Sequence, residues 1–253
     1  MATPVYGAVE LDILSTMDTS IVSKVSFMKL KIILPVLILL LAAACSPAPQ
    51  LLDEKLLHDT SLITNDPCEA PCWLGIVPGE TSWRDASIVI EDHGNFANIE
   101  TLEDEQGNTD AKMMSWTEID GSACCRMYTR DGNTVSALLL LLAPDLTLQQ
   151  VMDVQGEPDY LIGEPVTDDQ ALVSLIYPDK QLVVYAFTAG EAEGQISGES
   201  PVIGSIYLDD EDMTAVMSTT SMYQWDGYAS LSDYISKEYD YIPESTLEPE
   251  TNN

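Results

Sequence analysis

The hydrophobic pattern changes its period several times between residues 81 and 236, and each change marks a predicted element. Residues 81–94 have helical spacing, because Trp83, Ala86 and Ile90 fall on one face and Ser82 precedes them at the N-cap position. The next residues alternate with the period of two that is typical of strands. The predicted strands are residues 97–102, 113–117, 123–129 and 134–143.

The third and fourth of these strands are predicted to form a hairpin. Asp131 and Gly132 separate them, and this dipeptide between apolar runs is a strong signal for a tight turn. Residues 138–142 are five consecutive leucines, which fit either a strand or a buried helix by periodicity alone. The short run and the preceding hairpin favour a strand in the middle of a sheet.

The same succession of elements begins again at Thr147. Thr147 and Gln150 match a capping box, Leu148 and Val151 face one side of the predicted helix, and Gly156 ends it. Strands are again predicted to follow, at residues 160–162, 171–177, 181–188 and 202–208. When Ser82 is aligned with Thr147, the apolar positions of the two helices coincide.

This repetition predicts an α+β fold of two tandem units, residues 68–143 and 144–212, each a helix packed on an antiparallel β-meander sheet. A unit of this size buries too little surface to be stable alone, so the two are expected to pack side by side. Residues 213–236 are predicted to be a closing segment with a short helix at 230–236. Residues 237–253 are acidic and predicted to be disordered.

The N-terminal part has the pattern of an export signal that begins at Met28. Residues 1–27 are acidic and unlike a targeting segment, so they are interpreted as a mis-called extension. Residues 28–44 combine two lysines, an apolar run too short to span a bilayer, and three alanines before Cys45. This ending resembles the lipobox of bacterial lipoproteins, which implies acylation of Cys45 and a tether over residues 45–67. The alternative is an ordinary cysteine after a plain secretory cleavage site.

Residues 68–82 mark the start of the folded part. Cys68 and Cys72 enclose a loop that a disulfide can close, and an apolar plug and a Pro-Gly turn follow it. Export favours disulfides, so Cys68 is predicted to pair with Cys72, although a link from this loop to the strand at residues 123–129 remains an alternative. Cys124 and Cys125 are adjacent and are not expected to pair with each other. Strand alternation places Cys124 toward solvent and Cys125 toward the core.

The chain is strongly acidic. Its net charge is −32, and the part from Cys45 onward has seven Lys and Arg against 39 Asp and Glu. Such a chain repels phosphate backbones and anionic headgroups, which excludes nucleic acid as a partner and leaves the lipid as the expected membrane contact. Any protein partner is expected to present basic patches.

No catalytic or metal-binding constellation is evident, and none is predicted. The two histidines, His58 and His93, are far apart, and nucleophile, zinc and phosphate-loop motifs are missing. Residues 104–110 and 209–212 carry oxygen ligands suited to Ca²⁺ but lack EF-hand spacing, so solvated loops are the preferred interpretation. A hydrolase would need two carboxylates in a cleft, one with a raised pKa.

Two resemblances bear on function. The motif Cys-x-x-Pro-Cys-Trp-x-Gly-Ile-x-Pro-Gly-x-Thr at residues 68–81 resembles a family of uncharacterised Chloroflexi lipoproteins. The helix and meander pattern is similar to the repeats of SmpA/OmlA assembly lipoproteins and of the β-lactamase-inhibitor protein. Together they imply a lipid-anchored protein on the extracytoplasmic face of the cell membrane, a non-catalytic binding or assembly module without cofactors. The alternatives are an exported carboxylate-dependent hydrolase or a Ca²⁺-binding envelope protein.

Overall fold

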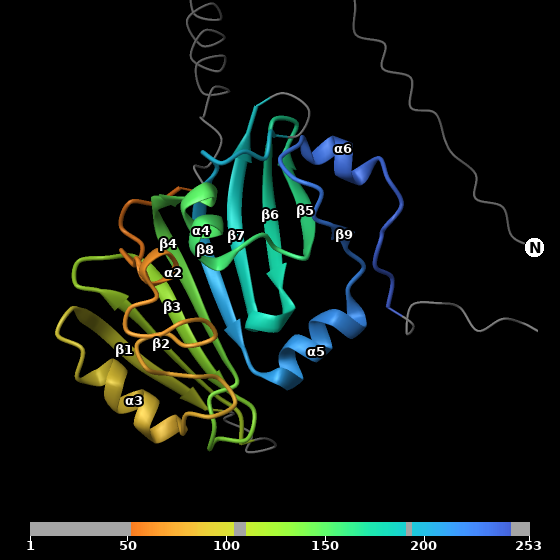
Figure 1. Cartoon of the computed structure of the whole chain (residues 1–253). Helices are drawn as coiled ribbons and strands as arrows, with labels where there is room; N and C mark the ends of the chain where they lie inside the picture. The colour runs from red at the N-terminus through yellow and green to blue at the C-terminus, as the bar shows by residue number, and fades with distance from the viewer. Residues whose placement is uncertain (1–51, 104–109, 191–193, 244–253) are drawn as a thin grey trace, which may run out of the picture. The chain divides into compact units, whose positions relative to one another are not determined.

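Strand β4 (Ala137–Thr147) contains the five leucines and lies in the interior of the sheet, where it pairs with β3 on one side and β8 on the other. Leu138, Leu140 and Leu142 are almost fully buried, so the prediction of a central strand is confirmed. The computed structural model describes residues 52–103, 110–190 and 194–243. Within these residues all strands join one sheet (Figure 1).

The sheet is antiparallel throughout, and its order is β1-β2-β3-β4-β8-β7-β6-β5-β9. Its other strands are β1 (Phe96–Glu103), β2 (Lys112–Glu118), β3 (Ala123–Thr129), β5 (Tyr160–Thr167), β6 (Gln170–Tyr177), β7 (Leu182–Ala189), β8 (Pro201–Leu208) and β9 (Tyr223–Gln224). The predicted strands are thus present, and two meanders of four strands meet where β4 pairs with β8.

The predicted fold of two tandem helix-on-meander units is wrong. A single nine-stranded sheet replaces the two units, because β4 and β8 share a long antiparallel register that includes Leu138 with Tyr207 and Leu140 with Ser205. Each of these strands would otherwise be an edge with unpaired backbone groups. Pairing the two edges satisfies those groups and merges the meanders, and the local pattern carries no information about that choice.

Short helices flank the sheet. They are α2 (Ser61–Thr64), α3 (Trp83–Glu91), α4 (Leu148–Gln155), α5 (Asp210–Thr219) and α6 (Leu231–Ile235), with a 3₁₀ turn η1 at Pro178–Lys180. The predicted caps are confirmed: the Ser82 hydroxyl accepts the Asp85 amide, and Thr147 and Gln150 form a full capping box. Helix α5 was not predicted. It begins at Asp209, whose carboxylate accepts the Asp212 amide, so residues 209–212 are a capped helix start and not a solvated loop.

The two faces of the sheet are covered unequally. The main core lies on one face, where Trp73 and Ile76 of the loop before α3 pack with the large side chains of β2, β4 and β6. We name this the covered face; α2, α3 and α4 lie in front of it in Figure 1. A second cluster, with Ile176, Val183 and Met213, lies on the opposite side, because these strand residues alternate with core residues of the covered face. Helix α5 covers only part of that opposite face.

Two segments expected outside the folded part belong to it. Leu57 and Leu62, assigned to the tether, are buried, and Leu57 bridges to Leu142 of β4. Tyr241, assigned to the disordered tail, exchanges backbone hydrogen bonds of 2.9 and 3.0 Å with Met222. Apolar side chains in polar surroundings gave too weak a periodic signal to reveal this packing. Residues 1–51 and 244–253 lie outside the described residues.

Candidate functional site

The part of the opposite face left open by α5 carries a row of apolar side chains across four strands. Leu102 of β1 pairs with Met113, Met113 with Tyr128, and Tyr128 with Ala137 of β4. Paired residues in an antiparallel sheet point to the same side, so these four form one continuous strip. We name it the apolar row. Leu102 is 57% exposed and the other three are half-buried.

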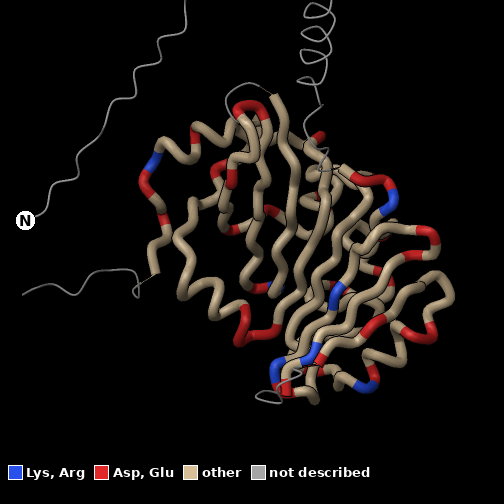
Figure 2. Tube along the Cα trace, turned by 180° about the vertical axis from the view of Figure 1, so that it is seen from behind, with Lys and Arg blue, Asp and Glu red and all other residues tan. Residues whose placement is uncertain are grey.

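The apolar row forms the floor of an open cavity of about 540 Å³. At one end stand Arg130, at the end of β3, and Asp212, in the first turn of α5. Lys112, which pairs with Thr129 on the neighbouring strand, also lines the cavity and donates to Glu103 at 2.9 Å. The size and the mixture of apolar floor and few charged groups are those of a binding site. Figure 2, which views the molecule from behind, shows acidic positions concentrated in loops and helices around the strands.

Arg130 is the centre of the charged end. Its guanidinium donates to the carboxylates of Asp209, Glu211 and Asp212, the Glu211 contact being 3.1 Å. The hydrogen bond to Asp209, together with the other two carboxylates, raises the pKa of Arg130 further above its ordinary value. Burial, and then repulsion from Asp209, raise the pKa of Asp212, and Arg130 only partly opposes these effects. The cluster therefore carries more negative charge than its one guanidinium neutralises.

A smaller cavity of about 400 Å³ lies on the other side of Arg130 and connects this cluster to the motif at residues 68–81. Pro78, Gly79 and Glu80 line it opposite Asp209. Gly79 has a φ of +83°, and a Cβ added there would lie 3.2 Å from the Asp209 Cβ. The Gly79 amide also donates to the Val135 carbonyl at 2.8 Å, which fixes the turn against the β3–β4 hairpin. The Pro-Gly turn thus positions the start of α5.

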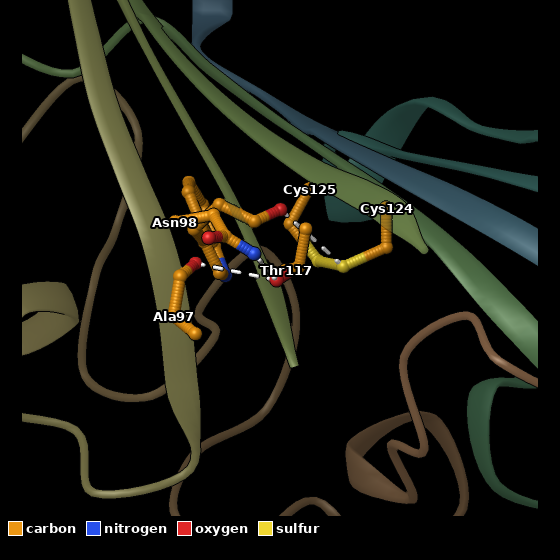
Figure 3. Close-up of a disulfide and its surroundings, with 6 residues drawn as sticks. Ala97, Asn98, Thr117, Cys124 and Cys125 are labelled. Carbon is orange, nitrogen blue, oxygen red and sulfur yellow. Dashed lines mark hydrogen bonds between the residues drawn. A yellow bond between two sulfur atoms is a disulfide. The ribbon is translucent and has the colours of Figure 1, made fainter. Parts of the chain in front are cut away.

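The four cysteines of the described residues form two disulfides. Cys68 and Cys72 are joined with an S–S distance of 2.01 Å. Cys124 and Cys125 are joined to each other, so the expectation that adjacent cysteines do not pair is wrong, and so is the exposure expected for Cys124, since both are 2% exposed. Trp116 pairs with Cys125 but Thr117 pairs with Ala123, which makes Cys124 the extra residue of a β-bulge. Figure 3 shows the two sulfurs beside Thr117, whose hydroxyl donates to the Ala97 carbonyl at 3.3 Å.

The bulge explains why strand alternation failed at this point. An extra residue breaks the period of two, so consecutive side chains at positions 124 and 125 no longer point to opposite faces. The broken register also gives the backbone freedom to close a ring between neighbours. Nothing in the composition of residues 123–129 marks the bulge.

The remaining residues that the sequence singled out lie apart from the cavity. His58 forms an ion pair with Asp145, and this hydrogen bond raises the pKa of His58. His93 stacks on Phe96 at a centroid distance of 4.0 Å, and Phe96 in turn stacks on Trp73 at 6.1 Å. Cys45 and residues 104–109 of the first acidic loop lie outside the described residues. In the described part of the chain, no group of three or more His, Cys, Asp or Glu side chains is arranged to hold a metal ion.

Sequence reasoning missed the cavity because its charged residues had structural explanations. Arg130 directly precedes the predicted Asp131-Gly132 turn, and Lys112 lies at the start of a strand. One signal was available: the described residues contain only seven Lys and Arg, and three of them, Lys112, Arg126 and Arg130, fall on β2 and β3 or directly after them. Such local concentration of a rare residue type indicates a defined role.

Comparison of the chain with protein families, curated proteins and solved structures finds no match. The resemblances to Chloroflexi lipoproteins and to SmpA/OmlA repeats therefore stay predictions. Among residues 52–103, 110–190 and 194–243, no helix has the length and hydropathy needed to cross a bilayer.

Proposed function

We propose that this protein is an extracytoplasmic lipoprotein, anchored through Cys45, that binds another macromolecule without catalysing a reaction. The observation that carries the binding part is the apolar row, which leaves Leu102 and its neighbours partly in water on one face of the sheet. Clustered apolar surface beside a cavity is characteristic of interaction sites. The anchor rests on residues 28–45, whose pattern would keep this face outside the membrane.

The ion pairs of the cavity favour binding over catalysis. Glu103 is held by Lys112 and Asp212 by Arg130, so both carboxyl groups of the lining already have cationic partners. A carboxylate engaged in an ion pair is a poor general base or nucleophile.

Carboxylate-dependent hydrolysis is a second candidate because the pKa of Asp212 is raised. That candidate also requires a second, available carboxylate in the same cavity, and Glu103 is the other one in the lining. Turnover of glycoside, ester or peptide substrates by the purified full chain, lost in Asp212→Asn, would support it and contradict the binding proposal.

Fractionation of cells tests the anchor. The wild-type protein is expected in the membrane fraction, labelled by a radioactive fatty acid, and Cys45→Ala is expected to be unlabelled and released, since each buried methylene contributes about 0.8 kcal/mol to membrane attachment. An unchanged membrane fraction for Cys45→Ala would contradict a lipid anchor at this residue.

Co-purification from detergent-solubilised native membranes tests the binding face. Leu102→Ser is expected to lose a co-purifying protein that the wild type retains. Ile119→Ser is the matched control, because Ile119 is also 57% exposed but lies in the loop after β2, outside the apolar row. Equal recovery with both variants would reject the face as the binding site.

A further inference from the structure

The charged end of the cavity has a net negative charge that the described residues leave uncompensated. One guanidinium, that of Arg130, faces three carboxylates, a net of −2. The N-terminus of α5 contributes about half a positive charge near Asp212, which reduces this excess without cancelling it. Lys112 and Glu103, which also line the cavity, neutralise each other. The larger cavity thus combines an apolar floor with Asp212 at the edge of this negative cluster, whose other two carboxylates, Asp209 and Glu211, line the smaller cavity beyond Arg130.

The excess negative charge lies where an incoming group can reach it. Glu211 has a side chain 80% exposed and its contact with Arg130 is 3.1 Å, so it can turn toward a second cation. Asp212 lines the cavity directly, and its side chain is 31% exposed. Desolvation and the neighbouring Asp209 keep the pKa of Asp212 raised, and a positive group nearby would offset these effects by stabilising the ionised carboxylate.

We propose that this cavity receives an arginine side chain, flanked by apolar residues, from a segment of another protein. The inference rests on the proposed binding function and names the chemistry of the partner. The aliphatic stem of arginine would lie along Met113 and Tyr128, and its guanidinium would reach Asp212, which lines the cavity, and then Glu211, which lines the adjoining smaller cavity. Its planar fork of donors matches carboxylates in a bidentate way, which the ammonium of lysine does not.

The charge of the whole chain acts in the same direction. At a net charge of −32 the chain attracts basic segments and repels acidic ones, and this steering weakens as salt shortens the screening length. An anionic ligand is disfavoured here despite Arg130 and Lys112, because each of these cations already has a carboxylate partner.

The test uses the full chain in nanodiscs of zwitterionic lipid and three fluorescent peptides. The first has one arginine between leucines, the second has citrulline, an uncharged isostere, in its place, and the third has lysine. By fluorescence anisotropy at low salt, the arginine peptide is expected to bind about tenfold more tightly than the citrulline peptide, with lysine between them. The difference is expected to shrink as the screening length falls from about 30 Å at 0.01 M to about 8 Å at 0.15 M salt.

Two charge variants locate the site. Asp212→Asn and Glu211→Gln are each expected to remove most of the preference for arginine over citrulline. Glu91→Gln, on α3 over the covered face, changes the net charge equally and is expected to keep the preference. Because the Glu211 side chain is 80% exposed, Glu211→Gln is expected to fold normally. The inference can therefore still be tested if Asp212→Asn fails to fold.

Three results would overturn the inference: equal binding of the arginine and citrulline peptides, binding of neither peptide, or a preference that Glu211→Gln and Glu91→Gln reduce equally. The proposed function would survive them if Leu102→Ser still abolishes co-purification from native membranes, since that outcome shows binding at the face by a partner of different chemistry. Failure of both experiments would reject both proposals.

Discussion

The two faces of the sheet are buried to different extents although the same strands build them. On the covered face, Leu138, Leu140 and Leu142 of β4 are at most 1% exposed and pack beneath the helices and the loop at residues 68–81. Their neighbours Leu139 and Leu141 point to the other side, where Leu141 is 38% exposed. In this run of five leucines, alternate residues therefore fill the core of the covered face, and the others lie on the opposite face, partly in contact with water.

The largest expected effect is a difference in stability between alanine variants of two leucines, one on each face. Leu140→Ala is expected to lower the free energy of unfolding by about 2–5 kcal/mol, because it leaves a cavity in a closed core. Leu139→Ala removes the same atoms from a half-buried position and is expected to cost under about 1 kcal/mol. Urea unfolding of both variants measures the difference. Equal losses of unfolding free energy would mean that the opposite face is also buried in solution.

Substitutions in the Arg130 cluster test whether the ion pairs on the opposite face of the sheet stabilise the fold. Arg130→Met is expected to cost about 2 kcal/mol, since it leaves Asp209, whose side chain is 10% exposed, without its cation. Adding Asp209→Asn to this variant is expected to restore part of the loss. Arg126→Met is the control, because no ion pair to Arg126 is present among the described residues. A similar loss in the control would argue for lost packing as the cause.

The contact between Gly79 and Asp209 joins the motif at residues 68–81 to α5. Alanine substitutions at Gly79 and Gly75 separate the effect of this contact from the effect of backbone strain. Gly79→Ala combines a left-handed backbone with a Cβ 3.2 Å from the Asp209 Cβ, so a loss of about 1–2 kcal/mol is expected. Gly75→Ala has a similar φ of +80° but no atom within 4 Å, so strain alone, about 1 kcal/mol, is expected. If thermal unfolding shows the same loss for both, the Asp209 contact contributes nothing.

The smallest expected effect concerns the ion pair that fastens residues 52–58 to the sheet. The hydrogen bond that the protonated His58 ring donates to Asp145 raises the pKa of His58 above its ordinary value of 6.5 in the folded state. The stabilisation is therefore complete below about pH 6.5 and is lost as the pH rises through the raised value. Because both side chains are about half exposed, the contribution is expected to be about 0.5 kcal/mol or less. Asp145→Asn should remove this part of the pH dependence of unfolding. A dependence that persists must come from other groups.

The elements of this protein follow from its sequence because they depend on local physics. Ser82 and Thr147 cap helices through their own hydroxyl groups, Asp131-Gly132 makes a tight turn, and alternation marks the strands. Each signal involves residues a few positions apart, so no distant contact was needed to predict them. The residues of the cavity floor are likewise visible in the sequence as apolar members of strands.

Only the tertiary structure decided how these elements combine. The pairing of β4 with β8 made one sheet from two meanders, and the bulge at Cys124 buried a cysteine that strand alternation placed at the surface. Asp209 and Arg130 lie 79 positions apart, and their contact defines the charged end of the cavity. Contacts between distant residues depend on strand pairing and packing, which hydrophobic periodicity leaves open. The sequence by itself therefore determined the main strands, the helices α3, α4 and α6 and the acidic character, and the assembled sheet determined where the candidate site lies.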